Sequence, residues 1–373
     1  MSVKRTGWIW HESFNWHNTG NGSGFFAPGG HVQPGQSFDH PATKGRFASL
    51  VQASGYDEQL IALRPSTATD DEILRVHTQE YLDRVEALNA TGGDAGESAV
   101  FGPRGVPIAR LAAGAAVRAV RAVLSGEVDN AYALVRPAGH HAEPDRGRGY
   151  CIFANTSIAA RVAQSEFGVE RIAIVDWDVH HGNGTQAAFW DDPSVLTISL
   201  HQEQLYPVDS GFRSENGGPG AEGTSINIPL PAGTGDEGYL TALRQVVIPA
   251  LDRFRPDFII VGSGMDASAT DPLGRMVVTS EGFRALSREM VRAAERLTAG
   301  RIVFSHEGGY SAEYVPFCGM AVLEELSGIP SGVEDPYLVF MRSYPQLAIQ
   351  PWQREAIEAA AALVERVPAP VPA

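Results

Sequence analysis

The sequence predicts an α/β fold with a central, mostly parallel sheet and helices on both of its faces. Two observations predict it. Apolar runs such as IAIV, FIIV and IVF are continuous, which is typical of strands that are buried on both faces of a parallel sheet. These runs alternate with longer segments of helical periodicity, and repeated strand-then-helix units build a parallel sheet that is covered on both sides.

Seven segments are predicted to be strands. Each is a short apolar run that is rich in β-branched residues, as expected of a buried strand. In chain order they are residues 6–10, 131–135, 171–176, 195–201, 225–229, 257–262 and 301–306.

Four longer segments are predicted to be helices. Thr234 and Glu237 form a capping-box pattern at the start of one of them. Ser280 is expected to cap another, and Glu281 in its first turn favours the helix dipole. In chain order the four helices are residues 70–88, 108–124, 234–251 and 280–297.

The length of 373 residues suits two average domains or one large domain. The chain has no internal repeat and no long low-complexity linker that would mark a boundary. Residues 19–30 are rich in glycine and are expected to form one long loop. The Pro-rich tail, residues 366–373, is expected to fray.

Charge and composition narrow the classes of function. The chain has 29 Lys and Arg residues against 44 Asp and Glu residues, a net charge of −15. This acidity argues against nucleic acid or an anionic membrane as the main partner, because phosphate contacts need Lys and Arg. Cys151 and Cys318 form no CxxC pair, and the N-terminal apolar run is too short for a signal peptide. No stretch approaches the ~20 apolar residues of a membrane-spanning helix, so a cytoplasmic protein is expected.

The segment RIAIVDWDVHHGNGTQ carries the strongest chemical pattern. Asp176, Asp178 and His180 stand at alternate positions, so in an extended chain they point the same way. They follow a buried strand, at the end of the sheet where α/β proteins bind ligands. Asp178 and His180 offer an oxygen and a nitrogen donor, which suit Zn²⁺ or Fe²⁺. The alternative is a strand-end turn with hydrogen-bonded carboxylates.

A third metal ligand is predicted from the segment DFIIVGSGMDA. Here Asp266 follows a second buried strand and a flexible Gly-Ser-Gly turn. Two carboxylates and one imidazole would leave a fourth position open, which is typical of a catalytic zinc site. Taken alone, an Asp after a strand is more often a helix cap.

Two further segments offer acid–base and hydrogen-bonding groups. His140 and His141 lie in RPAGHHAEP, and adjacent histidines near carboxylates suggest an acid/base pair, since imidazole titrates near neutral pH. Tyr310 follows two glycines in SHEGGY, where its hydroxyl could donate to a developing oxyanion. The alternatives are a structural loop histidine and a structural turn tyrosine.

Together the motifs GHH, DWDVHHGNGTQ, SLH, GMDASATDPLG and EGGY resemble, in this order, the signatures of the histone deacetylase and acetylpolyamine amidohydrolase family. The likeness is greatest to its bacterial class II histone-deacetylase-like amidohydrolases, and it extends over nearly the whole chain. It implies one arginase-like α/β domain over residues 1–373. It also implies a zinc-dependent amidohydrolase that uses a metal-activated water to remove acetyl or other acyl groups from the ε-amine of lysine or similar amines.

The resemblance also implies a role for each site residue. Zn²⁺ would be held by Asp178, His180 and Asp266. His141 would act as general base and then as general acid. His140 would be largely cationic and would be oriented by Asp176. Tyr310 would donate a hydrogen bond to the substrate carbonyl. The catalytic residues implied are therefore His140, His141, Tyr310, Asp176 and Asn183.

Asn183 is the class II form of a position that holds Asp in class I, and it gives His141 a neutral partner. Ala138 replaces the second Pro of the usual PPGHH, which implies a slightly looser loop. Tunnel walls fall on Gly149, Tyr150, Tyr206 and Leu273, with Tyr at two positions where Phe is more usual. A structural K⁺ site would use Asp176, Asp178, His180, Ser199 and Leu200. A second would use carbonyls near Phe189, Asp192 and Val195.

Three alternatives to lysine deacylation stay open to different degrees. Polyamine-selective relatives carry an acidic residue in the loop that reads DPLG here, where this chain has Leu273. Leu273 therefore favours an acylated lysine protein, or small acylated amines in general, as the substrate over acetylpolyamines. A non-catalytic ligand-binding regulator is disfavoured because no ligand, histidine or Tyr310 is lost. An arginase-type two-metal site would need more carboxylates. Homo-oligomerisation is left open.

Overall fold

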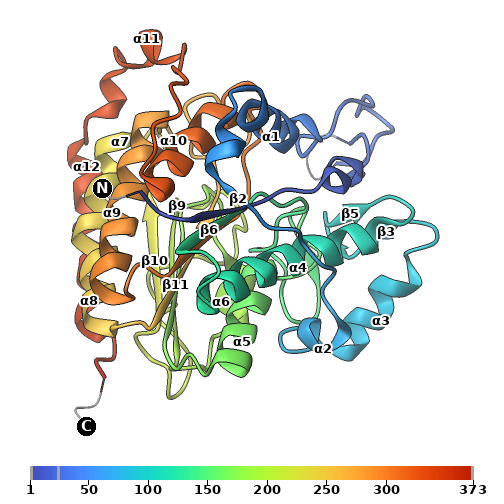
Figure 1. The fold of residues 1–373 in the computed structure, drawn as a ribbon, viewed down its shortest axis with the longest axis horizontal. Coiled ribbons are helices and arrows are strands. Elements are labelled where there is room, and N and C mark those ends of the chain that lie inside the picture. Colours follow the sequence, from blue (N-terminus) through green and yellow to red (C-terminus); the bar gives the residue numbers. More distant parts are fainter. Residues whose placement is uncertain (1–2, 23–25, 371–373) are drawn as a thin grey trace.

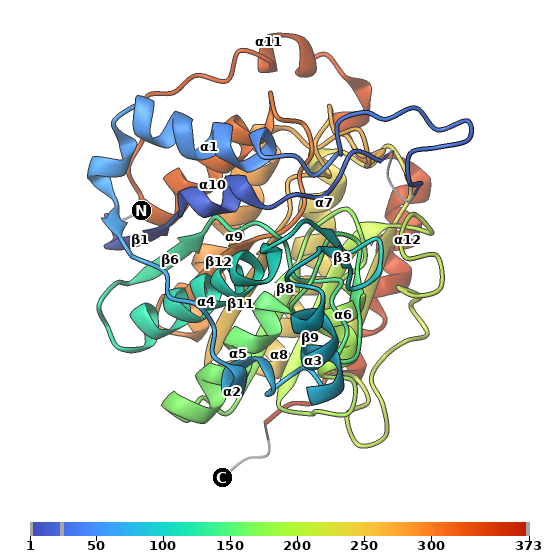
Figure 2. The same cartoon turned by 90° about the vertical axis from the view of Figure 1, so that its right-hand side faces the viewer.

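The structure is a computed structural model, and it describes residues 3–22 and 26–370. Its centre is a parallel sheet of eight strands in the order β10-β9-β8-β11-β12-β6-β1-β2, with helices on both faces (Figures 1 and 2). The predicted fold class is therefore confirmed. The strands of this sheet are β1 Thr6–Ile9, β2 Ile61–Ala62, β6 Asn130–Ala133, β8 Ile172–Asp176, β9 Val195–Gln202, β10 Ser225–Leu230, β11 Phe258–Ser263 and β12 Ile302–His306.

Seven of these eight strands coincide with the seven predicted segments, to within one or two residues at each end. The eighth, β2, is an edge strand of only two residues, both exposed, and it pairs with β1. Such a short exposed strand carries no pattern by which a sequence can reveal it. Four short strands form two small sheets outside the main one: β3 Gly93–Asp94 with β5 Val100–Phe101, and β4 Gly96–Glu97 with β7 Gly147–Arg148.

The helices cover the sheet in two layers (Figure 1). One layer holds α7 to α10 and α12, and the other holds α4 and α5. The α-helices are α1 Ala42–Ala53, α2 Asp70–Ile73, α3 Gln79–Ala87, α4 Gly105–Leu124, α5 Asn155–Phe167, α6 Asn183–Ala188, α7 Asp236–Ala242, α8 Ile248–Phe254, α9 Ser280–Leu297, α10 Val315–Ser327, α11 Leu338–Met341 and α12 Pro351–Ala361. Shorter turns are η1 Glu12–Trp16, η2 Tyr56–Gln59, η3 Leu243–Val247, η4 Pro345–Leu347 and η5 Val364–Arg366.

Six of the eight strands, β1, β6, β8, β9, β11 and β12, contribute side chains to two separate cores, which explains the continuous apolar runs. In β8, Ile172 and Ile174 face the core beneath α4 and α5. Ala173 and Val175 face the other core, beneath the α7 to α10 layer. Successive side chains of a strand point to opposite faces, so both sets must be apolar.

Three of the predicted helices need correction. The pattern over 70–88 predicts one helix, but Thr78 is extended and its side chain accepts from the N–H of Tyr81, so a new helix, α3, begins there. The predicted capping box at Thr234 is wrong, because its hydroxyl donates to the carbonyl of Pro231 and α7 begins at Asp236. Ser280 is not the cap of α9: Thr279 precedes it, and its side chain accepts from the N–H of Gly282.

The helix predicted over 234–251 also contains a π-helical segment, η3, between α7 and α8. Pro249 follows directly in the first turn of α8, and proline has no N–H to donate to the preceding turn. A wider turn ahead of it accommodates the missing hydrogen bond.

Two predicted irregular segments can be followed only in part. The Gly-rich stretch 19–30 holds no helix among its described residues, and residues 23–25 lie outside the described part of the chain. The predicted frayed tail is wrong at its start, because Val367 is buried and its carbonyl accepts from Arg253. The carbonyl of Pro368 likewise accepts from Arg171, and residues 371–373 are not described.

Within residues 3–22 and 26–370, no helix combines the length and apolarity needed to cross a membrane. Both cysteines, Cys151 and Cys318, are buried and unpaired.

Candidate active site

The predicted chemical groups follow four strands that are neighbours in the sheet. Strands β8, β11, β12 and β6 stand side by side, and the loops after them carry Asp178, Asp266, Tyr310 and His141. All four strands are parallel, so their carboxyl ends share one edge. This topology explains how segments far apart in the sequence build one site.

Asp178, His180 and Asp266 converge. One ligand atom from each lies within 4.8 Å of the others, and all three residues are buried. His180 Nδ1 lies 3.0 Å from an Asp178 oxygen and 3.1 Å from an Asp266 oxygen. The backbone N–H of Val179 donates to Asp266 over 2.7 Å, which fixes this carboxylate. The predicted set of three ligands is therefore assembled in space.

The electrostatics of this cluster favour a positive charge at its centre. Burial raises the pKa of Asp266 to about 8, with help from the neighbouring Asp178 carboxylate. Burial would lower the pKa of His180, but hydrogen bonds to both carboxylates raise it to about 10. Burial opposes ionisation of Asp178, yet His140 and His180 hold its pKa well below the usual range. Two buried carboxylates this close are stabilised when one of them holds a proton or when a cation lies between them.

The cluster fits a metal ion. Two oxygens and one nitrogen form a donor set that suits Zn²⁺. Gly308, after β12, donates its N–H to Asp178 over 2.6 Å, and a Cβ at this position would collide with the carboxylates of Asp178 and Asp266. Only glycine leaves the space in front of the ligands open.

His140 and His141 differ in their partners. His140 Nδ1 lies 2.9 Å from Asp176, whereas His141 Nδ1 lies 2.7 Å from the amide oxygen of Asn183. Burial opposes protonation of His140, but Asp178 and Asp176 raise its pKa well above the ordinary value. Burial and the charges on His140 and His180 hold the pKa of His141 well below it. One imidazole is therefore cationic and its neighbour neutral near pH 7.

Tyr310 lies beside the ligand cluster, with its ring centroid 6.3 Å from that of His180. Burial and the carboxylates of Asp266 and Asp178 raise the pKa of Tyr310 well above 10.0, so its hydroxyl keeps a proton to donate. The backbone N–H of Tyr310 donates to Asp271 over 2.7 Å. The other oxygen of Asp271 accepts from the N–H of Leu273, so one carboxylate joins Tyr310 to the DPLG loop.

Three of the predicted tunnel residues lie close to His141 or Tyr310. The Tyr206 ring meets the His141 ring edge-on with centroids 4.9 Å apart, and Tyr150 lies 5.9 Å from Tyr310. A Cβ added at Gly149 would come within 2.6 Å of the His141 ring and 2.8 Å of the Tyr206 ring. A side chain at position 149 would therefore crowd both rings.

Gly149→Ala is expected to displace the His141 and Tyr206 rings and to lower kcat/KM by about 10- to 100-fold, because small misplacements of reacting groups cost this much. Gly149 has a positive φ, so the substitution also strains the backbone. Gly168→Ala is the matched control, since Gly168 has a similar φ of +65° but no atom within 4 Å of an added Cβ. Equal kcat/KM values for the two variants on an acetyl-lysine peptide would contradict the assignment.

Several residues that help to build the site were not predicted from the sequence. Glu307 is buried and accepts from the backbone N–H groups of Gly139 and His140 and from Thr156 Oγ1. Glu307 lies with His140 and Cys151 in a second cluster of potential metal ligands, but its oxygens already accept these hydrogen bonds. Burial raises the pKa of Glu307 to about 7. Behind Tyr310, the buried Lys44 donates to the carbonyl of Gly309.

The predicted potassium ligands lie around the same strands. Asp176 at the end of β8 stands beside Ser199 of β9 in the register of the sheet, and both residues line a small cavity. Ser199 Oγ also lies 2.9 Å from His201 Nδ1.

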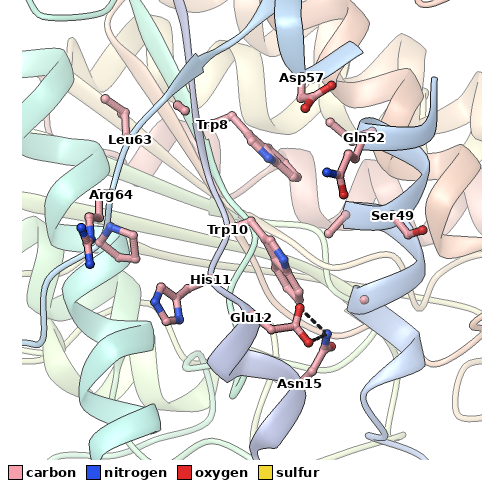
Figure 3. Close-up of a pocket in the computed structure, with 15 residues that line it drawn as sticks. Trp8, Trp10, His11, Glu12, Asn15, Ser49, Gln52, Asp57, Leu63 and Arg64 are labelled. Carbon is pink, nitrogen blue, oxygen red and sulfur yellow. Dashed lines mark hydrogen bonds between the residues drawn. The ribbon is translucent and has the colours of Figure 1, made fainter. Parts of the chain in front are cut away.

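A separate pocket lies at the edge of the sheet, between β1, η1 and α1 (Figure 3). Trp8, Trp10 and His11 line it, together with Glu12 and Asn15, which share a hydrogen bond of 3.1 Å. None of the predicted site residues reaches it. Among the described residues, the clusters of three potential metal ligands occur only at the carboxyl edge of the sheet, not here.

A parallel α/β sheet that presents two carboxylates, three imidazoles and a phenol at one edge defines a hydrolase of the deacetylase class. The chain belongs to the histone deacetylase family, because the family model described as "Histone deacetylase domain" matches residues 40–326. It is therefore a hydrolase that acts on amide bonds.

The relatives agree. The chain is 46% identical to a histone deacetylase-like amidohydrolase of Pseudomonas aeruginosa. The alignment of 372 residues covers 98% of each of the two chains. It is 38% identical over 313 residues to a protein named "Probable deacetylase" of Archaeoglobus fulgidus, over 81% of this chain and 85% of that one. The crystal structure of the HDA15 HD domain superposes with a TM-score of 0.82 at 30% identity, covering 97% of this chain and 96% of that chain.

Proposed function

We propose that the protein is a zinc-dependent amidohydrolase that removes acetyl groups from the ε-amine of lysine side chains or from similar amines. One observation carries the proposal: Asp178, His180 and Asp266 place their ligand atoms within 4.8 Å of one another, beside a neutral imidazole. Asp178, His180 and Asp266 would hold the zinc. When bound, zinc lowers the pKa of a water molecule and polarises the amide carbonyl.

The other residues act on protons and charge. His141 donates from Nδ1 to Asn183, so Nε2 is free to accept a proton from the attacking water. Tyr310 donates its hydroxyl to the oxyanion that develops on the carbonyl. His140, oriented by Asp176, stabilises negative charge as a cation. His141 then returns its proton to the leaving amine, which gives acetate and a free amine.

Several finer predictions belong to the same proposal. A structural K⁺ is proposed at Asp176, Asp178, His180, Ser199 and Leu200, supported by the register that sets Asp176 beside Ser199. A second is proposed at the carbonyls near Phe189, Asp192 and Val195. A single functional domain over 1–373, a cytoplasmic location, no nucleic-acid or membrane partner and an open oligomeric state remain predictions.

The nearest alternative is an acetylpolyamine deacetylase. Leu273 argues against it, because an apolar side chain offers no attraction to a second ammonium group. Acidic residues at the rim are already engaged: Glu97 lies 3.0 Å from Arg148, and Asp94 accepts backbone N–H groups of its own turn. The deciding experiment compares kcat/KM on an acetyl-lysine peptide, a longer acyl-lysine peptide and N-acetylputrescine. Turnover of none of them by metal-loaded protein would favour the non-catalytic regulator.

Leu273→Glu is expected to raise kcat/KM on N⁸-acetylspermidine several-fold relative to a neutral-flanked acetyl-lysine peptide. Unit charges about 4 Å apart interact by roughly 4 kcal/mol at an effective dielectric of ~20. Leu273 is half-buried near the protein surface, where solvent screening leaves about 1 kcal/mol of this attraction.

Leu273→Gln is the matched control, since it has the shape of Glu without the charge, and it should leave the ratio near the wild-type value. The wild type should prefer the peptide or show no strong preference. A wild type that favours acetylpolyamines by about tenfold or more, with Leu273→Glu changing nothing, would make the polyamine alternative the function.

A further inference from the structure

The orientation of the Asn183 side chain is determined by hydrogen bonds on two sides. Its oxygen lies 2.7 Å from His141 Nδ1, and its Nδ2 donates to Glu143 over 2.7 Å and to the carbonyl of His141 over 3.3 Å. A turned amide would place its oxygen against two acceptors and its NH₂ against the imidazole. Glu143 and the His141 carbonyl therefore select the observed orientation.

This orientation decides which nitrogen of His141 carries the proton. An amide oxygen can only accept, so Nδ1 of His141 must donate, and the lone pair of the neutral ring falls on Nε2. If the NH₂ group faced the ring instead, Nδ1 would have to accept and the proton would move to Nε2. A general base that works through Nε2 would then be blocked.

Glu143 is itself firmly held as an acceptor. Arg146 Nε donates to one of its oxygens over 2.8 Å, and Arg148 donates to the other over 3.1 Å. Burial would raise the pKa of Glu143, but the hydrogen bonds from these two arginines and Asn183 hold it below the usual value. The side chain of Glu143 is only 16% exposed and that of Arg148 only 6%.

We propose that Glu143 is a positioning residue for deacylation: by accepting from Asn183 Nδ2, it keeps the amide oxygen on His141 and so keeps Nε2 of His141 available as the base. The inference rests on the proposed function, in which His141 is that base. Glu143 acts only through Asn183.

Two isosteric substitutions test the proposal. E143M keeps the length of the side chain but removes the oxygen acceptor, and it is expected to lower kcat on an acetyl-lysine peptide by about tenfold or more with little change in KM. E143Q still offers an oxygen to Asn183 and should stay within about threefold of the wild type. Equal activity of E143M and the wild type, or equal loss in E143M and E143Q, would overturn the proposal.

A second substitution, N183D, is expected to have opposite effects on kcat in the wild-type protein and in E143M. N183D replaces the amide by two equivalent acceptors, so no orientation has to be selected. Beside Glu143 it sets two carboxylates against each other, and N183D alone is expected to lower kcat. In the E143M background that repulsion is absent, so N183D should raise kcat above the level of E143M alone. A purely structural role for Glu143 gives no such reversal, and a double variant that is no better than E143M contradicts the proposal.

The tautomer can be measured without activity, from ¹⁵N chemical shifts of the His141 ring in histidine-labelled protein, assigned with H141Q. We expect protonated Nδ1 in the wild type and E143Q and a shift toward protonated Nε2 in E143M. An unchanged tautomer in E143M overturns the proposal. This measurement also separates the two claims, because absence of deacylation by the wild type would remove the proposed function while the tautomer still decides whether Glu143 orients Asn183.

Discussion

Asp178→Ala is expected to remove bound metal and catalysis together, with kcat/KM on an acetyl-lysine peptide lower by at least about 10³-fold. The substitution deletes one of three ligand side chains and leaves Asp266 with His180 alone. Asp266→Ala should behave in the same way. The measurement is elemental analysis of the purified variants in parallel with kinetics.

Asp145→Ala is the control for Asp178→Ala, because Asp145 is exposed and only its backbone carbonyl accepts a side-chain hydrogen bond. It should keep both metal and activity. Chelation of the wild type should abolish activity, and Zn²⁺ should restore it. Full activity after exhaustive metal removal, with none detected by elemental analysis, would show that the ligand assignment is wrong.

Tyr310→Phe is expected to lower kcat by about 10²- to 10³-fold with little change in KM, because its hydroxyl acts mainly on the transition state. The phenol is buried near Asp266 and Asp178, which keep it protonated and able to donate. Steady-state kinetics on an acetyl-lysine peptide measure both constants.

Tyr150→Phe is the matched control for Tyr310→Phe. Its ring lies 5.9 Å from that of Tyr310, and no catalytic role is assigned to its hydroxyl, so removing that hydroxyl should change kcat little. If Tyr310→Phe kept the wild-type kcat, or if both variants lost the same amount, a specific role for the Tyr310 hydroxyl would be excluded.

The sheet could be predicted because its signal is local and strong. Ile172 and Ile174 serve one core and Ala173 and Val175 the other, so burial on both faces leaves a continuous apolar run in the sequence. The first residues of helices were harder to predict, because two neighbouring residues can each be suited to the N-cap position. Thr279 and Ser280 are both good caps, and only the packed structure shows that Ser280 donates instead to Asp335.

The convergence of the three candidate metal ligands and the two histidines could be predicted because each lies in a short motif with recognisable chemistry. Glu307 and Glu143 could not, although both stand within three residues of predicted groups. Their importance lies in which N–H groups they accept from, and those donors come from other segments of the fold. A sequence shows which residues can accept a hydrogen bond but not which distant donor reaches them.

The ligand cluster also bears on how firmly the chain stays folded. Asp266 and His180 are 86 residues apart in the sequence, and the loops that carry them follow two adjacent strands. A cation shared by both loops would cross-link them and relieve the repulsion between buried carboxylates. Binding to the folded state alone raises the free energy of unfolding by about 2.7 kcal/mol at a ligand concentration of roughly 100 times Kd. Metal-poor protein would then unfold more readily, so metal supply would govern the lifetime of the fold as well as turnover.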